Sequence, residues 1–126
     1  RIDFYQFLDV PSWTLANDRR LFLTANIEQR PQFIGFRWDR LNIDENHPYW
    51  DFYADVRSKR PKSIEPPINV GGWYFVKKDP GVEVSYVACV DAGGIIPTSI
   101  QNEVTKRTLP DNLGNMLQEA RKQSLQ

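Results

Sequence analysis

The chain has 126 residues, which is enough for one domain and too few for two. Its 16 basic and 16 acidic residues cancel, so it has no overall field that would attract nucleic acid or an anionic membrane. A single cysteine, Cys89, excludes an internal disulfide, and a single histidine, His47, excludes the usual zinc sites. The sequence shows no apolar run of membrane-spanning length and no signal-peptide pattern, and it leaves the compartment unknown.

Up to Asp91 the chain favours β-structure, because apolar and polar residues alternate with a period of two. Residues 32–41 are predicted to return beside 20–29 as a hairpin. Residues 57–69 are polar and proline-rich, which predicts an irregular loop. The turn at Asp79-Pro80-Gly81 predicts a second hairpin. The six predicted strands are 1–10, 20–29, 32–41, 49–56, 71–81 and 82–91.

After Gly94 the apolar period becomes helical. Pro97 suits a first helical turn, where its missing N–H costs nothing. Pro110 cannot donate to the carbonyl of Lys106, so a kink is expected there. We therefore predict one long amphipathic helix from near Pro97 to near Lys122, with apolar positions at Ile100, Val104, Leu113, Met116, Leu117 and Ala120.

These patterns predict an α+β fold, in which a helix lies across one face of an antiparallel sheet of about six strands. The chain also resembles the START domain, the lipid-transfer module of the helix-grip fold. Three stretches carry the resemblance in order along essentially all 126 residues. They are VPSWTLANDRRLFL with Pro11, Trp13 and Arg19, then GGWYF, and then the segment from Val84 to Leu117 with Asp91, Gly94, Ile96, Pro97 and Asn102.

The resemblance implies a single START-like domain over 1–126, with a curved sheet and a long, kinked C-terminal helix packed across it. The two glycines after the last strand would let the chain leave the sheet at a sharp angle. One position departs from the family pattern, because Arg20 stands where the family has an aspartate. The family's N-terminal helix and first strands have no counterpart here, and any role that depends on that aspartate is not carried over.

In the family, the space between sheet and helix holds a lipid or another apolar small molecule, and the implied function is to bind and transfer such a ligand without chemistry. Composition alone favours a plain core for the same residues. Arg19 is open to two interpretations: a grip on an anionic head group, or a structural ion pair with Asp18 or a strand carboxylate, which is favoured. The candidate ligand-binding residues are Val84, Tyr86, Ala88, Val104, Leu113, Met116, Leu117 and Arg19.

Two other classes of function stay open. A helix-grip enzyme of the cyclase or hydrolase type would need a polar cluster in the cavity, and the sequence shows no His–acid or Cys–His set. A protein–protein interaction module would use the same surface for a partner chain. We expect no catalytic residue, no metal and no cofactor.

The remaining polar residues favour ordinary structural roles. His47 is predicted to be a solvated loop residue and Cys89 a buried structural thiol. The basic run of Arg57, Lys59, Arg60 and Lys62 is predicted to be a solvated loop, with transient membrane contact as the alternative.

The missing early strands would leave an open sheet edge and an uncovered apolar surface. The expectation is therefore a homodimer, or a chain that is part of a longer protein with a further N-terminal segment.

Overall fold

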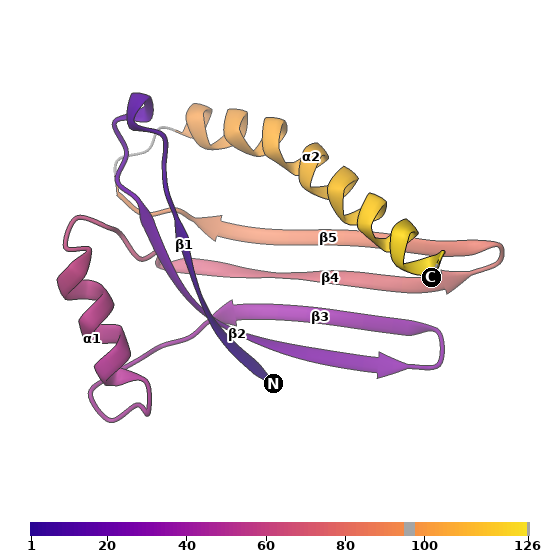
Figure 1. Cartoon of the computed structure of the whole chain (residues 1–126), viewed down its shortest axis with the longest axis horizontal. Helices are drawn as coiled ribbons and strands as arrows, with labels where there is room; N and C mark the ends of the chain where they lie inside the picture. Colours follow the sequence, from indigo (N-terminus) through magenta and orange to yellow (C-terminus); the bar gives the residue numbers. More distant parts are fainter. Residues whose placement is uncertain (95–97, 126) are drawn as a thin grey trace. The chain divides into compact units, whose positions relative to one another are not determined.

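The computed structural model describes residues 1–94 and 98–125, and the chain forms two compact units, residues 1–94 and 95–126. The first unit contains an antiparallel sheet and a short helix (Figure 1). The second contains one long helix. The predicted α+β class is confirmed.

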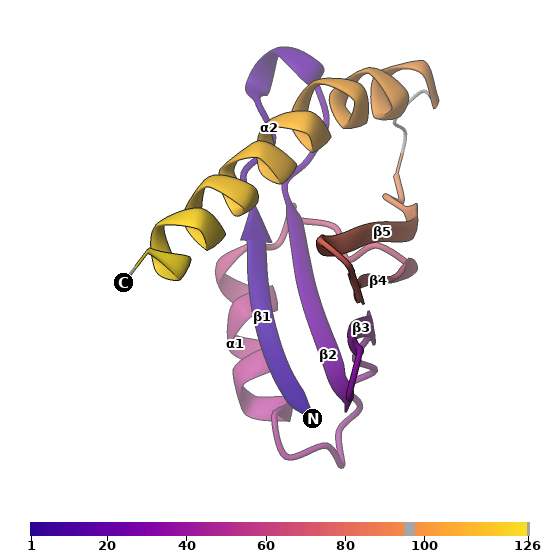
Figure 2. The same ribbon diagram turned by 90° about the vertical axis from the view of Figure 1, so that its right-hand side faces the viewer.

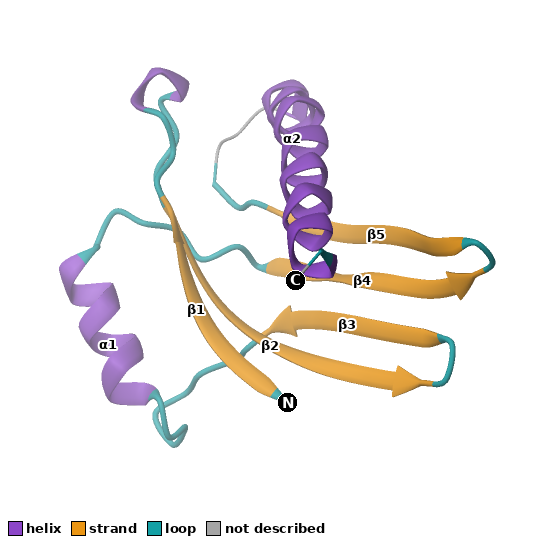
Figure 3. Ribbon diagram, turned by 45° about the vertical axis from the view of Figure 1, so that its right-hand side comes forward, coloured by secondary structure: helices purple, strands orange, loops and turns teal. Residues whose placement is uncertain are grey.

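The sheet has five strands, each paired antiparallel with the next along the chain, so β1 and β5 form its two edges. The alternating pattern correctly located all five, and both predicted hairpins are confirmed (Figure 3). The short turns Pro31-Gln32 and Asp79-Pro80 join their strands. The strands are β1 (Ile2–Leu8), β2 (Arg19–Arg30), β3 (Phe33–Arg40), β4 (Ile68–Lys78) and β5 (Gly81–Asp91).

The fourth predicted strand, 49–56, is wrong, because residues 50–56 belong to helix α1 (Trp50–Lys59) and Tyr49 is its N-cap. The segment is so rich in aromatic residues that it fits both periods. Trp50 and Tyr53 stack one helical turn apart, with ring centroids 5.7 Å apart, and Val56 is buried one turn further on. The Nζ of Lys59 lies 2.8 Å from the carboxylate of Asp55, an i,i+4 ion pair that only a helix can form.

The two faces of the sheet have different cores. On one face Phe22, Leu41 and Val56 form a cluster to which α1 contributes, and Figure 2 shows this helix beside β1 and β2. Since side chains alternate along a strand, Leu23 and Ala25 point to the opposite face. The cluster on that second face consists of Leu23, Ala25 and Trp38, with Phe4, Leu21, Phe36, Trp73 and Tyr86 packed against it. We call these eight residues the aromatic face.

Two glycines follow the end of β5 in a backbone conformation that favours glycine. Gly93 and Gly94 have φ angles of 67° and 70°, which residues with a Cβ rarely adopt. The two positions therefore need glycine, and the sharp angle at which the chain leaves the sheet stays a prediction.

The long helix is α2 (Thr98–Ser124), which agrees with the predicted helix to within about two residues at each end. Pro110 lies inside it, and the kink stays a prediction. The role given to Pro97 concerns a residue outside the described ones. The packing of this helix across the sheet also stays a prediction.

Candidate ligand-binding site

Four of the five rings of the aromatic face are positioned by the register of the three strands β3, β4 and β5. Trp73 pairs with Phe36 on one side and with Tyr86 on the other. The rings of Trp73 and Tyr86 have centroids 4.5 Å apart, and those of Phe36 and Trp38 lie 6.4 Å apart. Four large rings from three neighbouring strands thus form one continuous apolar cluster.

Trp38 reaches across a neighbouring strand to join this surface. It pairs with Gly71 of β4, and its indole stacks against Tyr86 of β5 with centroids 5.8 Å apart. The indole Nε1–H donates a hydrogen bond of 2.9 Å to Oδ1 of the buried Asn69. The polar atom of Trp38 is therefore satisfied within the protein, and the buried ring forms the apolar floor beneath the half-buried rings of Phe36, Trp73 and Tyr86.

The predicted residues of the last strand share this face. Val84, Tyr86 and Ala88 pair with Phe75, Trp73 and Gly71, respectively. Val84 and Tyr86 are half-buried and Ala88 is exposed. Burial raises the pKa of the Tyr86 phenol, so the hydroxyl stays neutral well above neutral pH.

The predicted helix residues lie along one side of α2. Leu113, Met116 and Leu117 are spaced by three and four residues, and the first two are half-buried while Leu117 is exposed. Val104 belongs to the same helix, but its side chain is outside the described residues.

Arg19 has a structural role that differs from both interpretations of the sequence. Its side chain donates hydrogen bonds to the carbonyl oxygens of Ala92 (2.6 Å), Gly93 (2.9 Å) and Asn17. Asp18 is engaged elsewhere, since its Oδ1 accepts a hydrogen bond of 2.9 Å from the backbone N–H of Val10. Arg19 is only 3% exposed, and this burial lowers the pKa of its guanidinium. It ties the start of β2 to the end of β5, so we leave it out of the proposed ligand site.

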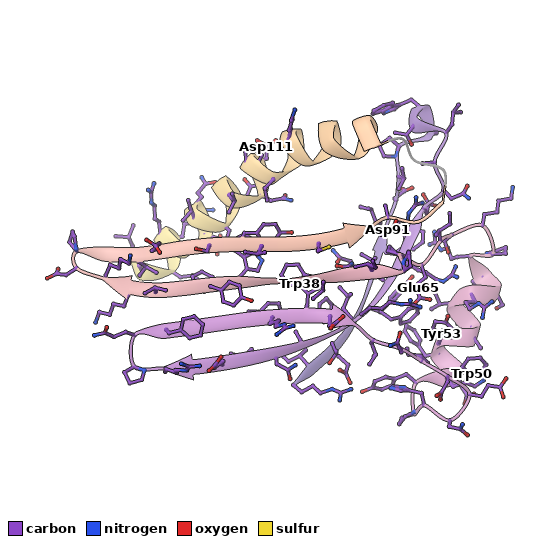
Figure 4. All side chains as sticks on the ribbon, turned by 180° about the vertical axis from the view of Figure 1, so that it is seen from behind. Trp38, Trp50, Tyr53, Glu65, Asp91 and Asp111 are labelled. Atoms are coloured by element: carbon purple, nitrogen blue, oxygen red, sulfur yellow. The ribbon has the colours of Figure 1, made fainter. Side chains whose placement is uncertain are left out.

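Arg20, which stands where the family has an aspartate, also has a structural role. Arg20 donates to the carbonyl oxygen of Ser63 and, at 2.9 Å, to its hydroxyl. Nearby, Glu65 links α1 to β3. It accepts hydrogen bonds from the Tyr53 hydroxyl (2.9 Å) and from Nε of Arg40 (3.1 Å), and Figure 4 labels Tyr53 and Glu65 at this end of the sheet. Burial, and then the hydrogen bond to Glu65, raise the pKa of the Tyr53 phenol.

A second candidate site, which the sequence did not indicate, lies on the α1 side of the sheet. It is a pocket of about 200 Å³ lined by one carboxylate and seven apolar or aromatic residues. The sequence analysis missed it because two of its aromatic walls lie in or beside the segment interpreted as a strand. The lining residues are Asp3, Phe4, Tyr5, Phe22, Leu41, Ile43, Tyr49 and Phe52.

Two of the four basic residues predicted to form a solvated loop belong to α1, and Arg60 and Lys62 follow the helix. Arg57 and Lys59 occupy its last turn, where positive charge favours the helix dipole. Arg60 lies over the ring of Phe7, 4.1 Å from its centroid, and Arg57 lies 5.7 Å from the ring centroid of Tyr53. Membrane contact by this run stays a prediction.

Cys89 is exposed, so the prediction of a buried thiol is wrong. The residue lies near the end of an edge strand, on the face opposite Tyr86. His47 accepts a hydrogen bond of 3.2 Å at Nδ1 from the backbone N–H of Tyr49. Over residues 1–94 and 98–125, no three His, Cys, Asp or Glu residues are grouped to hold a metal ion, and no helix has the length and apolarity to cross a bilayer.

No protein-family model, curated protein or solved structure matches this chain significantly.

Proposed function

We propose that the protein is a START-like module that binds, and can transfer, a lipid, a sterol-like molecule or another apolar small molecule on its aromatic face, without chemistry. The observation that carries this proposal is the continuous surface of Phe36, Trp38, Trp73 and Tyr86. Aromatic rings offer large apolar area at a small cost in conformational entropy, which suits them to hold an apolar ligand.

The proposal gives α2 the role of the covering helix of a helix-grip fold. Its apolar residues Leu113, Met116 and Leu117 would contact the ligand from the side opposite the sheet. This role comes from the START resemblance, and the position of α2 over the sheet is itself part of the proposal. Met116 would adapt to ligands of different shape, because its side chain is flexible and apolar.

The test is a binding titration with the fluorescent fatty acid cis-parinaric acid and the fluorescent sterol dehydroergosterol. Tyr86→Ala removes a ring from the aromatic face. Tyr74→Ala is the matched control, because Tyr74 lies on the neighbouring strand but belongs to the opposite face, where it stacks on Phe33. We expect Tyr86→Ala to weaken binding about threefold to tenfold and the control to leave it unchanged.

Binding of neither probe, or an equal loss in both variants, would contradict the proposal. Native mass spectrometry of the protein purified from its own host adds a separate measurement. A co-purified apolar small molecule agrees with the proposal, whereas a co-purified polypeptide would favour an interaction module.

A further inference from the structure

The pocket on the α1 side of the sheet combines aromatic walls with one negative charge. Tyr5 and Phe22 face each other across β1 and β2, with ring centroids 5.0 Å apart. Phe52 of α1 meets Tyr5 edge-on at 5.5 Å, and Tyr49 lines the pocket from the loop before the helix. Phe52 and Tyr49 are each close to half exposed, so the pocket is open to solvent on that side.

The charge comes from Asp3, which lines the same pocket and whose side chain is 16% exposed. The hydrogen bond from Arg1 lowers the pKa of this carboxyl, so it is ionised at neutral pH. A ring face is negative at its centre and attracts a cation. The aromatic rings and the carboxylate therefore favour the same kind of ligand, which is positively charged and has an apolar surface.

The contact between Arg1 and Asp3 shows that this carboxylate accepts an organic cation. The Nε of Arg1 lies 3.0 Å from Oδ1 and its Nη2 lies 3.3 Å from Oδ2. The side chain of Arg1 is 58% exposed, and an ion pair of such exposure contributes little to stability. A ligand cation that also contacts the rings can therefore replace Arg1.

The size of the pocket limits the ligand. Its volume of about 200 Å³ is below the roughly 300–1,000 Å³ of pockets that hold drug-sized molecules. A large apolar molecule does not fit, but an ammonium group with methyl substituents does. Each methyl carries part of the positive charge and can contact a ring, whereas a bare ammonium keeps its hydration shell.

We propose that this pocket binds the methylated ammonium group of a small organic cation, with Asp3 as the counter-charge and Tyr5, Tyr49 and Phe52 as the aromatic walls. Asp3, Tyr5 and Phe22 lie on the face of the sheet opposite the aromatic face, and Phe4 is the one lining residue that the two sites share. The proposal does not depend on the function proposed for the aromatic face.

The experiment compares choline with 3,3-dimethylbutan-1-ol, which has the same shape without the charge. Both are titrated into the full 126-residue chain, and binding is followed by nuclear magnetic resonance. Nuclear Overhauser contacts from the ligand methyl groups to the rings of Tyr5 and Phe52 locate the site. We expect choline to bind at least about threefold more tightly than the neutral alcohol, and to show contacts to both rings.

Three variants test separately the charge of Asp3, the ring of Phe52 and the competition by Arg1. Asp3→Asn and Phe52→Leu should each weaken choline binding about threefold to tenfold, because one removes the charge and the other a ring. Arg1→Gln should strengthen it, because the competing guanidinium is lost. Tyr74→Leu on the same sheet face, outside the pocket, is the control and should change nothing. Circular dichroism and the melting temperature establish that each variant is folded.

Equal affinity for choline and the alcohol would overturn the proposal. So would unchanged choline binding in both Asp3→Asn and Phe52→Leu, or weaker binding in Arg1→Gln. The same ammonium chemistry occurs in free choline and in a lipid head group. Retention of the protein on phosphatidylcholine vesicles that depends on Asp3 would identify the head group as the source, and choline binding without retention would identify the free cation.

Discussion

The indole of Trp38 lies over Gly71, so close that a Cβ atom at position 71 would stand 2.4 Å from its Cζ2. The same Cβ would stand 2.5 Å from the carbonyl oxygen of Val87. A hydrogen atom is therefore the only side chain that lets the ring cross β4 and stack on Tyr86. This one position allows the four large rings to form a continuous surface.

Gly71→Ala should accordingly destabilise the protein and disturb the aromatic face. Both close contacts involve atoms that cannot easily move, a packed ring and a backbone oxygen, so we expect a loss of about 1–3 kcal/mol in the free energy of unfolding. Chemical denaturation measures this loss, and near-ultraviolet circular dichroism reports the displaced indole. Gly81→Ala is the control, because a Cβ at that position meets no atom within 4 Å. Equal stability of the two variants would show that the ring moves aside freely.

Arg19→Met should lower stability without a specific effect on ligand binding. The substitution removes the hydrogen-bond donors to the carbonyl oxygens of Ala92 and Gly93. Both residues are half-buried, so we expect a loss near the lower end of the roughly 1–3 kcal/mol that an unpartnered buried acceptor costs. Arg37→Met is the control, since Arg37 is exposed and its loss should cost less than about 0.5 kcal/mol. A variant of unchanged stability that binds anionic lipids less well would instead assign Arg19 to a head-group site.

The stability of the protein should fall at alkaline pH through Tyr53 and Tyr86. Burial is the first cause that raises the pKa of each phenol in the folded state. Folding therefore favours the neutral form of each phenol, and the neutral phenols in turn stabilise the folded state. The stabilisation is complete below the unfolded pKa of about 10 and is lost as the pH rises through the higher folded pKa.

The measurement is urea denaturation at about pH 8 and at about pH 11, on either side of the ordinary tyrosine pKa. The double variant Tyr53→Phe/Tyr86→Phe should lose less stability between these two pH values than the natural sequence. An identical loss in the two proteins would mean that other groups cause the alkaline destabilisation.

Met116→Trp tests the covering role proposed for α2. A larger ring would occupy ligand space, so uptake of the fluorescent probes should weaken while the fold is retained, at an overpacking cost of about 1–3 kcal/mol. Gln118→Trp introduces the same ring at an exposed position on another side of the helix and should leave uptake unchanged. If Met116→Trp also leaves the uptake of both probes unchanged, Met116 is not at the site.

The alternating pattern by itself located the five strands and both hairpins, and the helical period located α2. These features depend on residues close together in the chain, so they can be predicted from a single sequence. Segment 49–56 was the exception. Its aromatic residues fit both periods, and the packing of Phe22 against Tyr53 and Phe52 accompanies the helical form. The i,i+4 pair of Asp55 and Lys59 was the local signal that could have corrected the prediction.

The candidate sites could not be predicted in full, because they depend on contacts between strands that are far apart in the chain. Val84, Tyr86 and Ala88 could be assigned to one face from their alternation, but their ring neighbours Trp38 and Trp73 follow from strand register. Register is decided by hydrogen bonds and packing between distant segments. Two of the three hydrogen-bond partners of Arg19 lie 73 and 74 residues further along the chain, so an ion pair with its neighbour Asp18 was the simpler expectation. The sequence by itself determined which segments form strands and the long helix. Only the tertiary structure decided which side chains meet across the sheet, because those contacts join residues far apart in the chain.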